Sequence, residues 1–409
     1  MTRIAVIGAG ISGLSVCYLL SKHSEFHIDL YEKENRLGGH THTHELEVKG
    51  DEVRVDSGFI VFNHINYPNL TRLFEELNVE INNSSMSFSY CTSNSAWSSQ
   101  DYKNLSFVIK KSSLKRMFEI IRFKKLALSN KKRITSQSLG DWLFANNFSS
   151  EFVNEYVLPM SSSIWSSHFD VIKDFPFETF VSFFDNHQLF NLVSRPQWKS
   201  LDNGSDQYIK KMQSAWKVNS VFLDANPQIS RTENFCITNQ GKSYEYDKII
   251  FGCHANQINQ VFPEINNILD SQVLNKFKYT DNPISIHTDL DVMPKNRKQW
   301  SSWNVQNIND KFFLTYWMNN LQRLNTKHDI FISVGEHSRI SKQKMIKAFN
   351  YQHPIYSSES IKAQHDLDAL QGKAGIYYVG AYLGYGFHED GLNSAIRVSN
   401  LIKEALGVF

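Results

Sequence analysis

Three glycines and one acid near the start of the chain have the types and spacing that point most directly to chemistry. Gly8, Gly10 and Gly13 form a G-x-G-x-x-G pattern directly after the apolar run 4–7 and before a segment that reads as a helix. In such a turn the first glycine allows the tight bend, the second lets the backbone approach a pyrophosphate, and the third lets the helix pack closely on the strand. Glu32 ends a second apolar run, 19 residues after Gly13, where a carboxylate can accept from a ribose hydroxyl. The pattern therefore predicts a βαβ unit with phosphates at the helix N-terminus.

Two further segments favour FAD over NAD as the cofactor. Arg36 precedes the glycine pair Gly38-Gly39, which lets a second backbone segment approach an extended cofactor. The Arg36 guanidinium offers a fixed fork for a phosphate or a neighbouring carbonyl. Near the other end of the chain, the expected strand 376–379 leads into a glycine-rich loop, and Gly391 lies at the start of the closing helix. Free N–H groups there would stabilise the negative charge of a reduced flavin, and a cofactor held by both segments must be long.

Three motifs in these segments resemble those of the flavin-containing amine oxidase superfamily, which also includes protoporphyrinogen oxidases and phytoene-type desaturases. They are G-A-G-I-S-G-L from residue 8, E-K-E-N-R-L-G-G-H from residue 32 and G-Y-G-F-H-E-D-G-L from residue 384. The chain is most similar to the bacterial predicted NAD/FAD-binding, amine-oxidase-like proteins, and the likeness covers essentially the whole chain. Further motifs of that group begin at Asp56, Tyr67, Arg195 and Cys253.

The resemblance implies an α/β fold in which an FAD-binding Rossmann-like (βαβ) domain is interleaved with an α+β substrate domain. The FAD-binding domain is expected at 1–83, 200–264 and 370–409, and the substrate domain at 84–199 and 265–369 with a helical basic segment at 107–135. Carried over position by position, the resemblance also implies a set of residues that line the FAD from its adenosine to its flavin ring. That set is Gly8, Gly10, Ser12, Gly13, Glu32, Arg36, Gly38, Gly39, His40, Ser57, Gly58, Phe59, Gln228, Gly380, Asp390, Gly391 and Leu392.

Three departures from the superfamily pattern bear on the reaction. His40 follows the glycine pair, where the superfamily often has Arg or Lys. The strand at 282–286 has no Lys, although amine oxidases often keep one there that holds a water at the flavin. His388 takes the aromatic-cage position before the helix glycine. These departures argue against simple amine oxidation, and the lack of any Cys after Cys253 indicates non-covalent FAD.

The sequence is compatible with three functions. The first is an oxidase or desaturase that acts on a lipophilic, acyl or isoprenoid-like substrate by hydride transfer to flavin N5. The second is an amine oxidase acting on a small amine, and the third is a non-catalytic flavin-binding partner protein. His388, His254 and Tyr316 are the candidate catalytic side chains near the flavin, each as a positioning group or as a general base.

An unusually aromatic stretch lies between residues 175 and 190. Its six phenylalanines are Phe175, Phe177, Phe180, Phe183, Phe184 and Phe190. Rings of this kind either fill the core of a domain or line an apolar tunnel for a lipophilic substrate. The sequence leaves both interpretations open.

The segment 109–133 concentrates positive charge in a chain whose formal net charge is only +2. It contains ten Lys or Arg residues and a single acid, Glu119. Within it, Leu114, Met117, Phe118 and Ile121 are spaced to share one face of a helix, with basic residues beside them. A basic amphipathic helix is typical of contact with an anionic membrane, and the alternative is a solvated helix face. Nucleic acid is not expected as a partner, since no binding fold accompanies the charge.

Composition limits the remaining possibilities. The 409 residues are 41% hydrophobic and 21% charged, as in ordinary globular proteins, and no apolar run is long enough to span a bilayer. Four scattered cysteines without a C-x-x-C pair argue against disulfides and a zinc site, and His40, His42 and His44 along one strand are too spread to bind one ion. We therefore expect no metal, and a cytoplasmic protein that associates with the cytoplasmic face of a membrane if the basic segment binds lipid.

Overall fold

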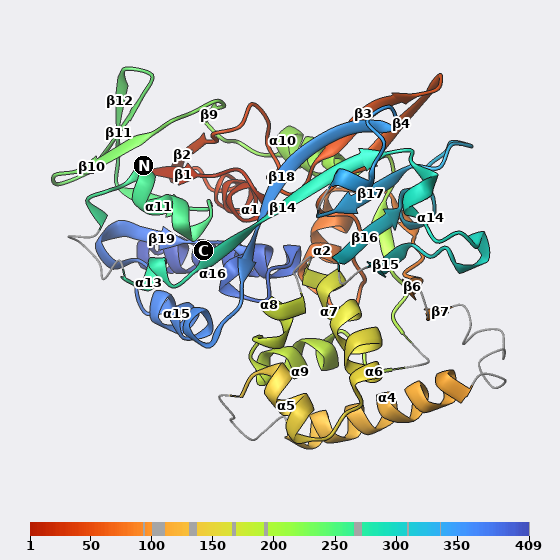
Figure 1. The fold of residues 1–409 in the computed structure, drawn as a ribbon. Coiled ribbons are helices and arrows are strands. Elements are labelled where there is room, and N and C mark those ends of the chain that lie inside the picture. The colour runs from red at the N-terminus through yellow and green to blue at the C-terminus, as the bar shows by residue number, and fades with distance from the viewer. Residues whose placement is uncertain are drawn as a thin grey trace.

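The computed structural model describes residues 1–92, 95–99, 111–130, 137–165, 169–191, 195–265, 272–308, 311–335 and 337–408 (Figure 1). Two regions, each built on its own sheet, lie side by side, and a group of helices lies below the larger sheet in this view. The predicted α/β class with a Rossmann-like sheet is confirmed.

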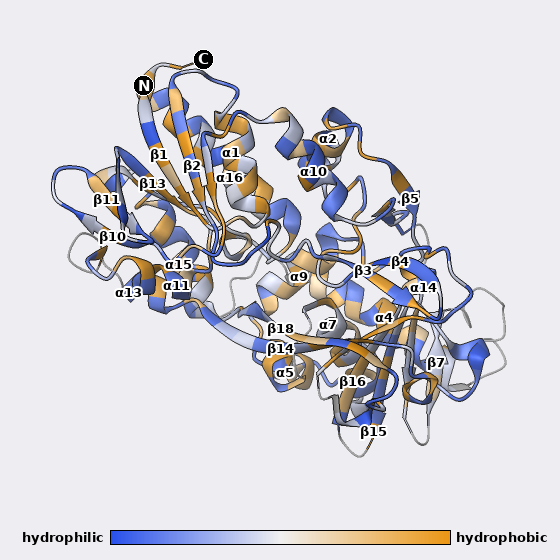
Figure 2. Ribbon diagram, turned by 90° about the horizontal axis from the view of Figure 1, so that it is seen from above, coloured by the Kyte–Doolittle hydropathy of each residue, from blue (hydrophilic) through white to orange (hydrophobic). Residues whose placement is uncertain are grey.

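A five-stranded sheet forms the centre of the first region, and all its neighbouring strands pair in parallel. In spatial order the strands are β19 (Ile376–Tyr378), β13 (Lys248–Phe251), β1 (Thr2–Ile7), β2 (Phe26–Tyr31) and β9 (Ser220–Phe222). Ile4 and Val6 of β1 pack into the core on one face of the sheet, and Ala5 and Ile7 pack into the core on the other. Because both faces are covered, β1 is a nearly continuous apolar run, and it is coloured accordingly in Figure 2.

Helices cover both faces of this sheet. On the first face, α1 (Ile11–Leu20) and α16 (His388–Leu406) pack against the sheet. Helix α2 (Pro68–Glu76) packs on α16, and α10 (Asp206–Ala215) packs on α1. The second face packs against α11 (Ala255–Val261), α13 (Gln272–Asn275), α15 (Ser358–Asp368) and a three-stranded antiparallel sheet of β10 (Gln228–Arg231), β11 (Phe235–Asn239) and β12 (Lys242–Tyr246). Helices α1 and α16 belong to opposite ends of the chain, yet they lie next to each other in both ribbon views (Figures 1 and 2).

A seven-stranded sheet forms the second region. Its spatial order is β18 (Met345–Ile355), β14 (Lys278–His287), β17 (Phe331–Val334), β16 (Lys311–Trp317), β15 (Trp303–Ile308), β6 (Phe88–Cys91) and β7 (Ala96–Ser98). Neighbouring strands are antiparallel except β6 and β15, which are parallel. The long strands β14 and β18 run from this sheet toward the first region (Figure 1).

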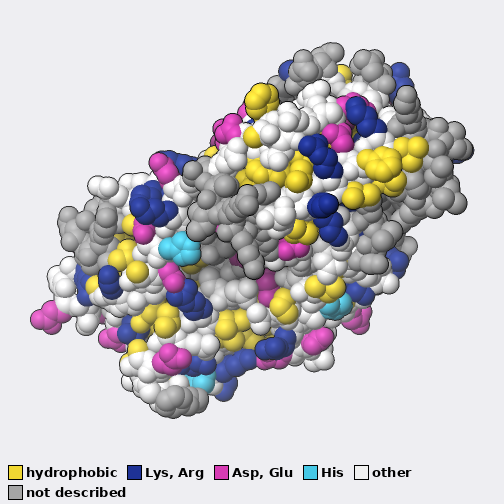
Figure 3. Space-filling model, turned by 90° about the horizontal axis from the view of Figure 1, so that it is seen from below, with side chains coloured by type: hydrophobic (Ala, Val, Ile, Leu, Met, Phe, Trp, Pro, Cys, Tyr) yellow, Lys and Arg dark blue, Asp and Glu magenta, His cyan; other side chains and the backbone are white. Residues whose placement is uncertain are grey.

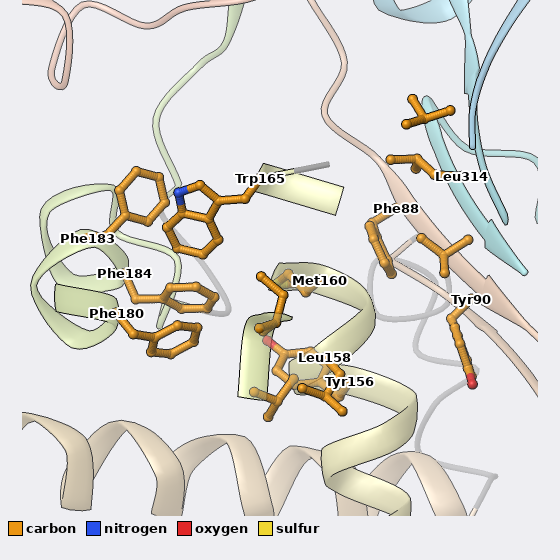
Figure 4. Packing of buried hydrophobic residues seen from close by; sticks show 14 of the residues in the cluster. Phe88, Tyr90, Tyr156, Leu158, Met160, Trp165, Phe180, Phe183, Phe184 and Leu314 are labelled. Atoms are coloured by element: carbon orange, nitrogen blue, oxygen red, sulfur yellow. The ribbon is translucent and has the colours of Figure 1, made fainter. Parts of the chain in front are cut away.

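A helical group packs on the second region. It consists of α4 (Lys111–Asn130), α5 (Leu139–Ala145), α6 (Ser150–Phe152), the π-helical turn η2 (Val153–Val157), α7 (Leu158–Trp165), α8 (Phe169–Lys173) and α9 (Phe177–Asn186). The six phenylalanines of the aromatic stretch are 0–5% exposed and belong to the same hydrophobic cluster as the sheet. Phe180, Phe183 and Phe184 lie together with Trp165 in Figure 4, and the rings of Phe180 and Phe184 stack at 4.1 Å. Of the two interpretations of this aromatic stretch, the structure therefore agrees with core packing.

The remaining elements are short connections. Two antiparallel pairs join β3 (Thr43–Val48) to β4 (Asp51–Asp56) and β5 (Ile81–Asn83) to β8 (Lys199–Leu201). The others are the helix α14 (Met318–Leu321) and the 3₁₀ turns η3 (Leu290–Val292), η4 (Arg297–Gln299), η5 (His337–Arg339), η6 (Lys373–Gly375) and η7 (Ala381–Leu383). Among the described helices, none combines the length and apolarity that a bilayer crossing requires.

The strands sort by region much as the expected domains do, but two segments differ. All strands of the five-stranded sheet come from ranges assigned to the FAD-binding domain, and all strands of the seven-stranded sheet come from ranges assigned to the substrate domain. However, the range expected for the substrate domain also contains Leu274 of α13 and Leu367 of α15, which belong to the same hydrophobic cluster as residues of β13 and β19. Helix α4 covers 111–130 of the basic segment, whose outer parts lie outside the described residues.

Candidate functional site

The glycine loop between β1 and α1 has three positions with different surroundings. Gly8 has a φ of +101°, and a Cβ added there would lie 2.6 Å from the backbone nitrogen of Cys253. A Cβ on Gly13 would overlap the carbonyl oxygen of Gly8, so this glycine is required by the close approach of α1 to β1. A Cβ on Gly10 would meet no atom within 4 Å. The protein itself therefore leaves open space over Gly10, at the N-terminus of α1, where the sequence predicts the pyrophosphate.

Glu32 is fixed beside this loop at the end of β2. Its Oε2 accepts a hydrogen bond from the Ala9 N–H at 2.6 Å, and its Oε1 accepts from the Glu34 N–H at 2.9 Å. A carboxylate has about four acceptor positions, so two remain for a ribose diol. The backbone of Glu32 also pairs with the segment that leads to β10, donating to the Phe222 carbonyl at 2.8 Å. That segment ends at the exposed Gln228, which the resemblance places at the adenine.

The loop that follows Arg36 lies directly on the glycine loop. The Gly38 N–H donates to the Ala9 carbonyl at 2.8 Å, and Gly39 approaches Gly10 so closely that its Cβ would lie 3.0 Å from the Gly10 Cα. The Arg36 guanidinium donates to the Gly39 carbonyl at 2.9 Å and to the Thr41 carbonyl at 3.3 Å. The sequence predicts that Arg36 binds either a phosphate or a neighbouring carbonyl, and in the structure it binds two carbonyl groups of its own loop.

The start of α16 completes the site from the other end of the chain. A Cβ on Gly391 would lie 2.8 Å from the Ser12 Oγ, so the N-termini of α1 and α16 meet here. Both ends present unpaired N–H groups and a partial positive charge to the same region. Asp390 accepts from the Phe387 N–H at 2.9 Å, and burial raises the pKa of its carboxyl to about 7. Leu392 packs in the core beneath, and the Gly380 N–H donates to Ser394.

His388 is held in a fixed position by two neighbours, Phe59 and Thr41. Its ring stacks on Phe59 with the centroids 3.9 Å apart, and its Nε2 lies 2.9 Å from the Thr41 Oγ1. The same hydroxyl lies 2.6 Å from the Tyr208 hydroxyl. Burial lowers the pKa of His388 to about 3, so the ring is neutral at physiological pH. The Phe59 N–H donates to the His40 carbonyl at 2.8 Å, which joins this group to the glycine-pair loop.

Three further aromatic side chains gather around His40. Its ring centroid lies 6.0 Å from His254, 5.1 Å from His353 and 4.8 Å from Tyr351. Burial lowers the pKa of His40 to about 4 and the pKa values of His254 and His353 to about 3. The His40 Nε2 and the His254 Nδ1 are buried without a hydrogen-bond partner. Since buried polar atoms are normally satisfied, these two nitrogens mark a place where a polar ligand fits.

A second polar network reaches Ser57 from strand β18. The Lys347 Nζ lies 3.1 Å from the His44 Nδ1, and the His44 Nε2 lies 2.8 Å from the Ser57 Oγ. An ammonium group only donates, so His44 accepts at Nδ1 and its Nε2–H donates to Ser57. The Ser57 Oγ lies 2.7 Å from the Tyr351 hydroxyl. A Cβ on the next residue, Gly58, would overlap the His40 carbonyl, so Ser57 is held against the same loop.

Sequence reasoning missed Lys347 and its network. The segment 282–286 of β14 has no lysine, but Lys347 pairs with Ile286 from the adjacent strand β18. The sequence holds no local signal for this contact, because His44 and Lys347 are far apart in the chain. It also missed Glu389, whose carboxylate accepts from the N–H groups of Asn69 and Leu70, both at 2.9 Å, at the start of α2.

Most of the predicted site residues are brought together, and Tyr316 is not among them. Fourteen of them lie on, or pack against, the glycine loop, the Arg36 loop, the 57–59 segment or the N-termini of α1 and α16. These are Gly8, Gly10, Ser12, Gly13, Glu32, Arg36, Gly38, Gly39, His40, Ser57, Gly58, Phe59, His388 and Gly391. His254 joins them through His40. Tyr316 lies on β16 in the second region, where its ring packs on Trp303 at 4.8 Å, and its role stays a prediction. Among the described residues, no group of three or more His, Cys, Asp or Glu side chains is arranged to hold a metal ion.

The site fits a dinucleotide on three observations. There is open space over Gly10, two buried histidine nitrogens lack partners, and two helix N-termini converge at Ser12 and Gly391. Diphosphate oxygens accept hydrogen bonds both from backbone N–H groups at helix N-termini and from imidazole N–H groups. Glu32 follows the second strand of the βαβ unit, which is where the ribose of a bound dinucleotide is expected.

Comparisons with known proteins agree with this geometry. The NAD(P)-binding Rossmann-like domain family matches residues 6–77. Similar solved structures include a cyclohexylamine oxidase from Brevibacterium oxydans (15% identity, TM-score 0.70, 99% of each chain covered) and a putrescine oxidase bound to putrescine (15%, 0.71, 98% of this chain and 99% of that one). A CLA-producing fatty acid isomerase from P. acnes is also similar (11%, 0.70, 98% of each chain). No curated protein sequence matches the chain.

Proposed function

Because this chain has the fold of the flavin-containing amine oxidase superfamily, we propose that it is an FAD-dependent oxidoreductase. The observation that carries the proposal is the junction of Ser12 and Gly391, where two helix N-termini and the open space over Gly10 face one site. A dinucleotide pyrophosphate needs this combination of N–H groups, positive dipole ends and room for close backbone approach. When bound, FAD supplies the capacity to accept a hydride.

The residues of this chain would hold the cofactor without a covalent bond. Gly8, Gly10 and Gly13 would surround the pyrophosphate, and Glu32 would hold the ribose through its remaining acceptor positions. His40 takes the place of a permanently charged residue and would offer its free Nε2 to the cofactor. Non-covalent attachment is expected, since the chain has no Cys after residue 253.

Two fixed networks would orient the reacting partners. His388 stacks on Phe59 and contacts the Thr41 hydroxyl, so its ring has a fixed orientation. Because its pKa is lowered, the ring would line the site as an uncharged hydrogen-bonding group and not as a cation. The Lys347–His44–Ser57 chain fixes the tautomer of His44, whose Nε2–H holds the Ser57 hydroxyl in one orientation. Both networks reach the 57–59 segment, which the resemblance places beside the flavin ring.

We favour a lipophilic, neutral substrate over a protonated amine, and the charges around the site support this choice. The two buried aspartates nearby are already satisfied by protein donors. Asp390 accepts from the Phe387 N–H, and Asp56 accepts from the Ser205 N–H and from Gln322. Burial raises the pKa of each to about 7, so neither is a strong anionic partner for an ammonium group. A cationic amine would need such a partner when it leaves water.

The first experiment is a visible spectrum of the purified protein, followed by acid precipitation. An oxidised flavin spectrum whose chromophore stays in the supernatant and is identified as FAD supports non-covalent FAD. A chromophore that pellets with the protein would contradict non-covalent attachment. A protein that binds no flavin when incubated with FAD would refute the proposal.

The second experiment is anaerobic mixing of the FAD-loaded protein with candidate donors. Bleaching by acyl or isoprenoid compounds supports the lipophilic substrate, whereas bleaching by small amines alone supports the amine oxidase alternative. A protein that retains FAD but is bleached by neither class, while dithionite still reduces it, favours the non-catalytic flavin-binding alternative.

A further inference from the structure

Helix α4 has two faces with different surroundings. Its inner face contributes Ile120, Phe123 and Ala127 to the core of the second region, where they are 0–2% exposed. Its outer face carries Phe118 and Ile121, which are 66% and 51% exposed. The inner residues satisfy the packing requirement of the helix, so the outer two are not needed for the core.

A third apolar side chain joins this outer face from α5. Phe144 is 87% exposed. Its helix ends against the middle of α4, where Arg122 donates to the carbonyl oxygens of Asn146 and Asn147. The Asn147 N–H in turn donates to the Phe144 carbonyl at 3.0 Å. Phe118, Ile121 and Phe144 therefore project from one local surface, which we call the α4–α5 face.

Basic side chains alternate with these apolar ones. Lys115, Arg122 and Lys125 are exposed. Lys115 precedes Phe118 by three residues, Arg122 follows Phe118 by four, and Lys125 follows Ile121 by four, so each lies beside an apolar side chain on the helix surface. Figure 3 views the molecule from below, onto the side where α4 lies, and shows hydrophobic and basic side chains next to each other there. The surrounding segment 109–133 carries ten basic residues and one acid.

The acidic groups near the α4–α5 face are engaged within the protein. Glu119, the single acid of the segment, accepts from the Ser149 N–H at 3.0 Å and from its hydroxyl at 2.6 Å. Glu151 pairs with Lys115 at 2.9 Å, and Asp141 accepts from Ser138 at 2.8 Å. Lys125 is exposed and keeps its charge available to an anionic surface, whereas the Arg122 guanidinium is partly engaged by the Asn146 and Asn147 carbonyls.

We propose that the α4–α5 face docks on the surface of an anionic lipid bilayer. Exposed aromatic and branched side chains that alternate with Lys and Arg enter the headgroup region while the cations meet the lipid phosphates. Protein interfaces differ, because their buried cores are depleted of lysine and their apolar groups are contiguous. The proposal goes beyond the oxidoreductase assignment and does not depend on it.

Co-sedimentation of the full chain with phosphatidylcholine vesicles, with and without phosphatidylglycerol, tests the proposal. We expect binding that requires phosphatidylglycerol and weakens with added salt. The double variant F118S/F144S should bind at least tenfold more weakly, and K125E several-fold more weakly. Both should melt like the wild type, because the changed side chains are exposed.

Two matched controls change equivalent residues elsewhere. Leu290 on η3 is 49% exposed and Lys342 is exposed, so L290S and K342E alter apolar surface and charge to a similar degree away from the α4–α5 face. Both controls should bind vesicles like the wild type. Absence of vesicle binding by the wild type at low salt, equal binding to uncharged vesicles, or unchanged binding by F118S/F144S would each overturn the proposal. A flavin defect would leave this result unaffected.

Discussion

Adding one methyl group at each of two glycines of the same loop should have opposite consequences. Gly10→Ala places a Cβ in space that the protein leaves open, whereas Gly13→Ala places it on the carbonyl oxygen of Gly8. The first change should therefore affect the cofactor and spare the fold, and the second should damage the fold itself. The chemical change is identical, so each variant is the control for the other.

The expected magnitudes follow from the surroundings of each position. Gly10 is the N-cap of α1 with a φ of −73°, which alanine adopts without strain. A lower unfolded-state entropy favours alanine by about 0.4–1 kcal/mol, and the poorer N-cap costs a similar amount, so stability changes by about 0.5 kcal/mol or less. At Gly13, α1 must move away from β1, and such overpacking costs about 1–3 kcal/mol.

Gly10→Ala, which changes stability less than Gly13→Ala, should weaken FAD binding more. A methyl group over Gly10 would hold the pyrophosphate away from the N–H groups at the start of α1. Losing one charge-assisted hydrogen bond costs about 1.5–3 kcal/mol, which raises the Kd for FAD about 10- to 100-fold.

Two measurements are needed on protein stripped of flavin. FAD is titrated while its fluorescence is followed, and the melting temperature is recorded without FAD, so that ligand stabilisation does not enter. We expect Gly10→Ala to keep the wild-type melting temperature and bind FAD weakly, and Gly13→Ala to melt several degrees lower. If Gly10→Ala binds FAD with the wild-type Kd, the pyrophosphate does not lie over Gly10 and the reasoning is wrong.

Three further changes test other parts of the site. Arg36→Lys loses the fork that spans two carbonyls, so FAD should bind about tenfold more weakly in the same titration, and an unchanged Kd would show that the fork does not shape the site. Burial lowers the pKa of His40 from 6.5 to about 4 and that of His254 from 6.5 to about 3. Below pH 6.5 the unfolded chain therefore binds more protons than the folded chain, and the folded state loses stability. At pH 5.5 each histidine lowers the free energy of unfolding by up to about 1.4 kcal/mol. The raised pKa of Asp390 has the opposite effect on stability, but it is present in both the wild type and the H40N/H254N variant, so it cancels in their comparison. Between pH 7.5 and pH 5.5, the free energy of unfolding measured with denaturant should fall less in H40N/H254N than in the wild type. Glu389→Ala leaves two N–H groups at the start of α2 without their acceptor and should cost about 1–3 kcal/mol in chemical denaturation; no loss would mean that water replaces the carboxylate.

The parts of the site that sequence reasoning found are those whose requirements are local. Gly8 and Gly13 are needed because the backbone passes too close to other backbone for any side chain, and such requirements leave glycines at fixed spacing. Glu32 follows from the length of one βαβ unit. The approach of Gly391 to Ser12 follows less directly, from glycine-rich segments at opposite ends of the chain that one extended cofactor would have to contact.

Contacts between distant strands were beyond the reach of the sequence. Lys347 meets His44 through the register of β18 on β14, and alternating side chains in a strand do not reveal which residues a neighbouring strand will face. On α4, helix periodicity predicted a surface face that includes Phe118 and Ile121, and the structure leaves both exposed. It did not reveal that Ile120, Phe123 and Ala127 form the side of α4 that packs in the core.

The junction of α1 and α16 also governs when the site can exist during synthesis. The glycine loop leaves the ribosome early, at about 5–20 residues per second, and α16 follows only after both regions have been made. Until then α1 can pack on β1, β2 and α10 but lacks the helix that carries Gly391, so a nascent chain holds only half of the cofactor site. We therefore expect the flavin to bind only after α16 has been made.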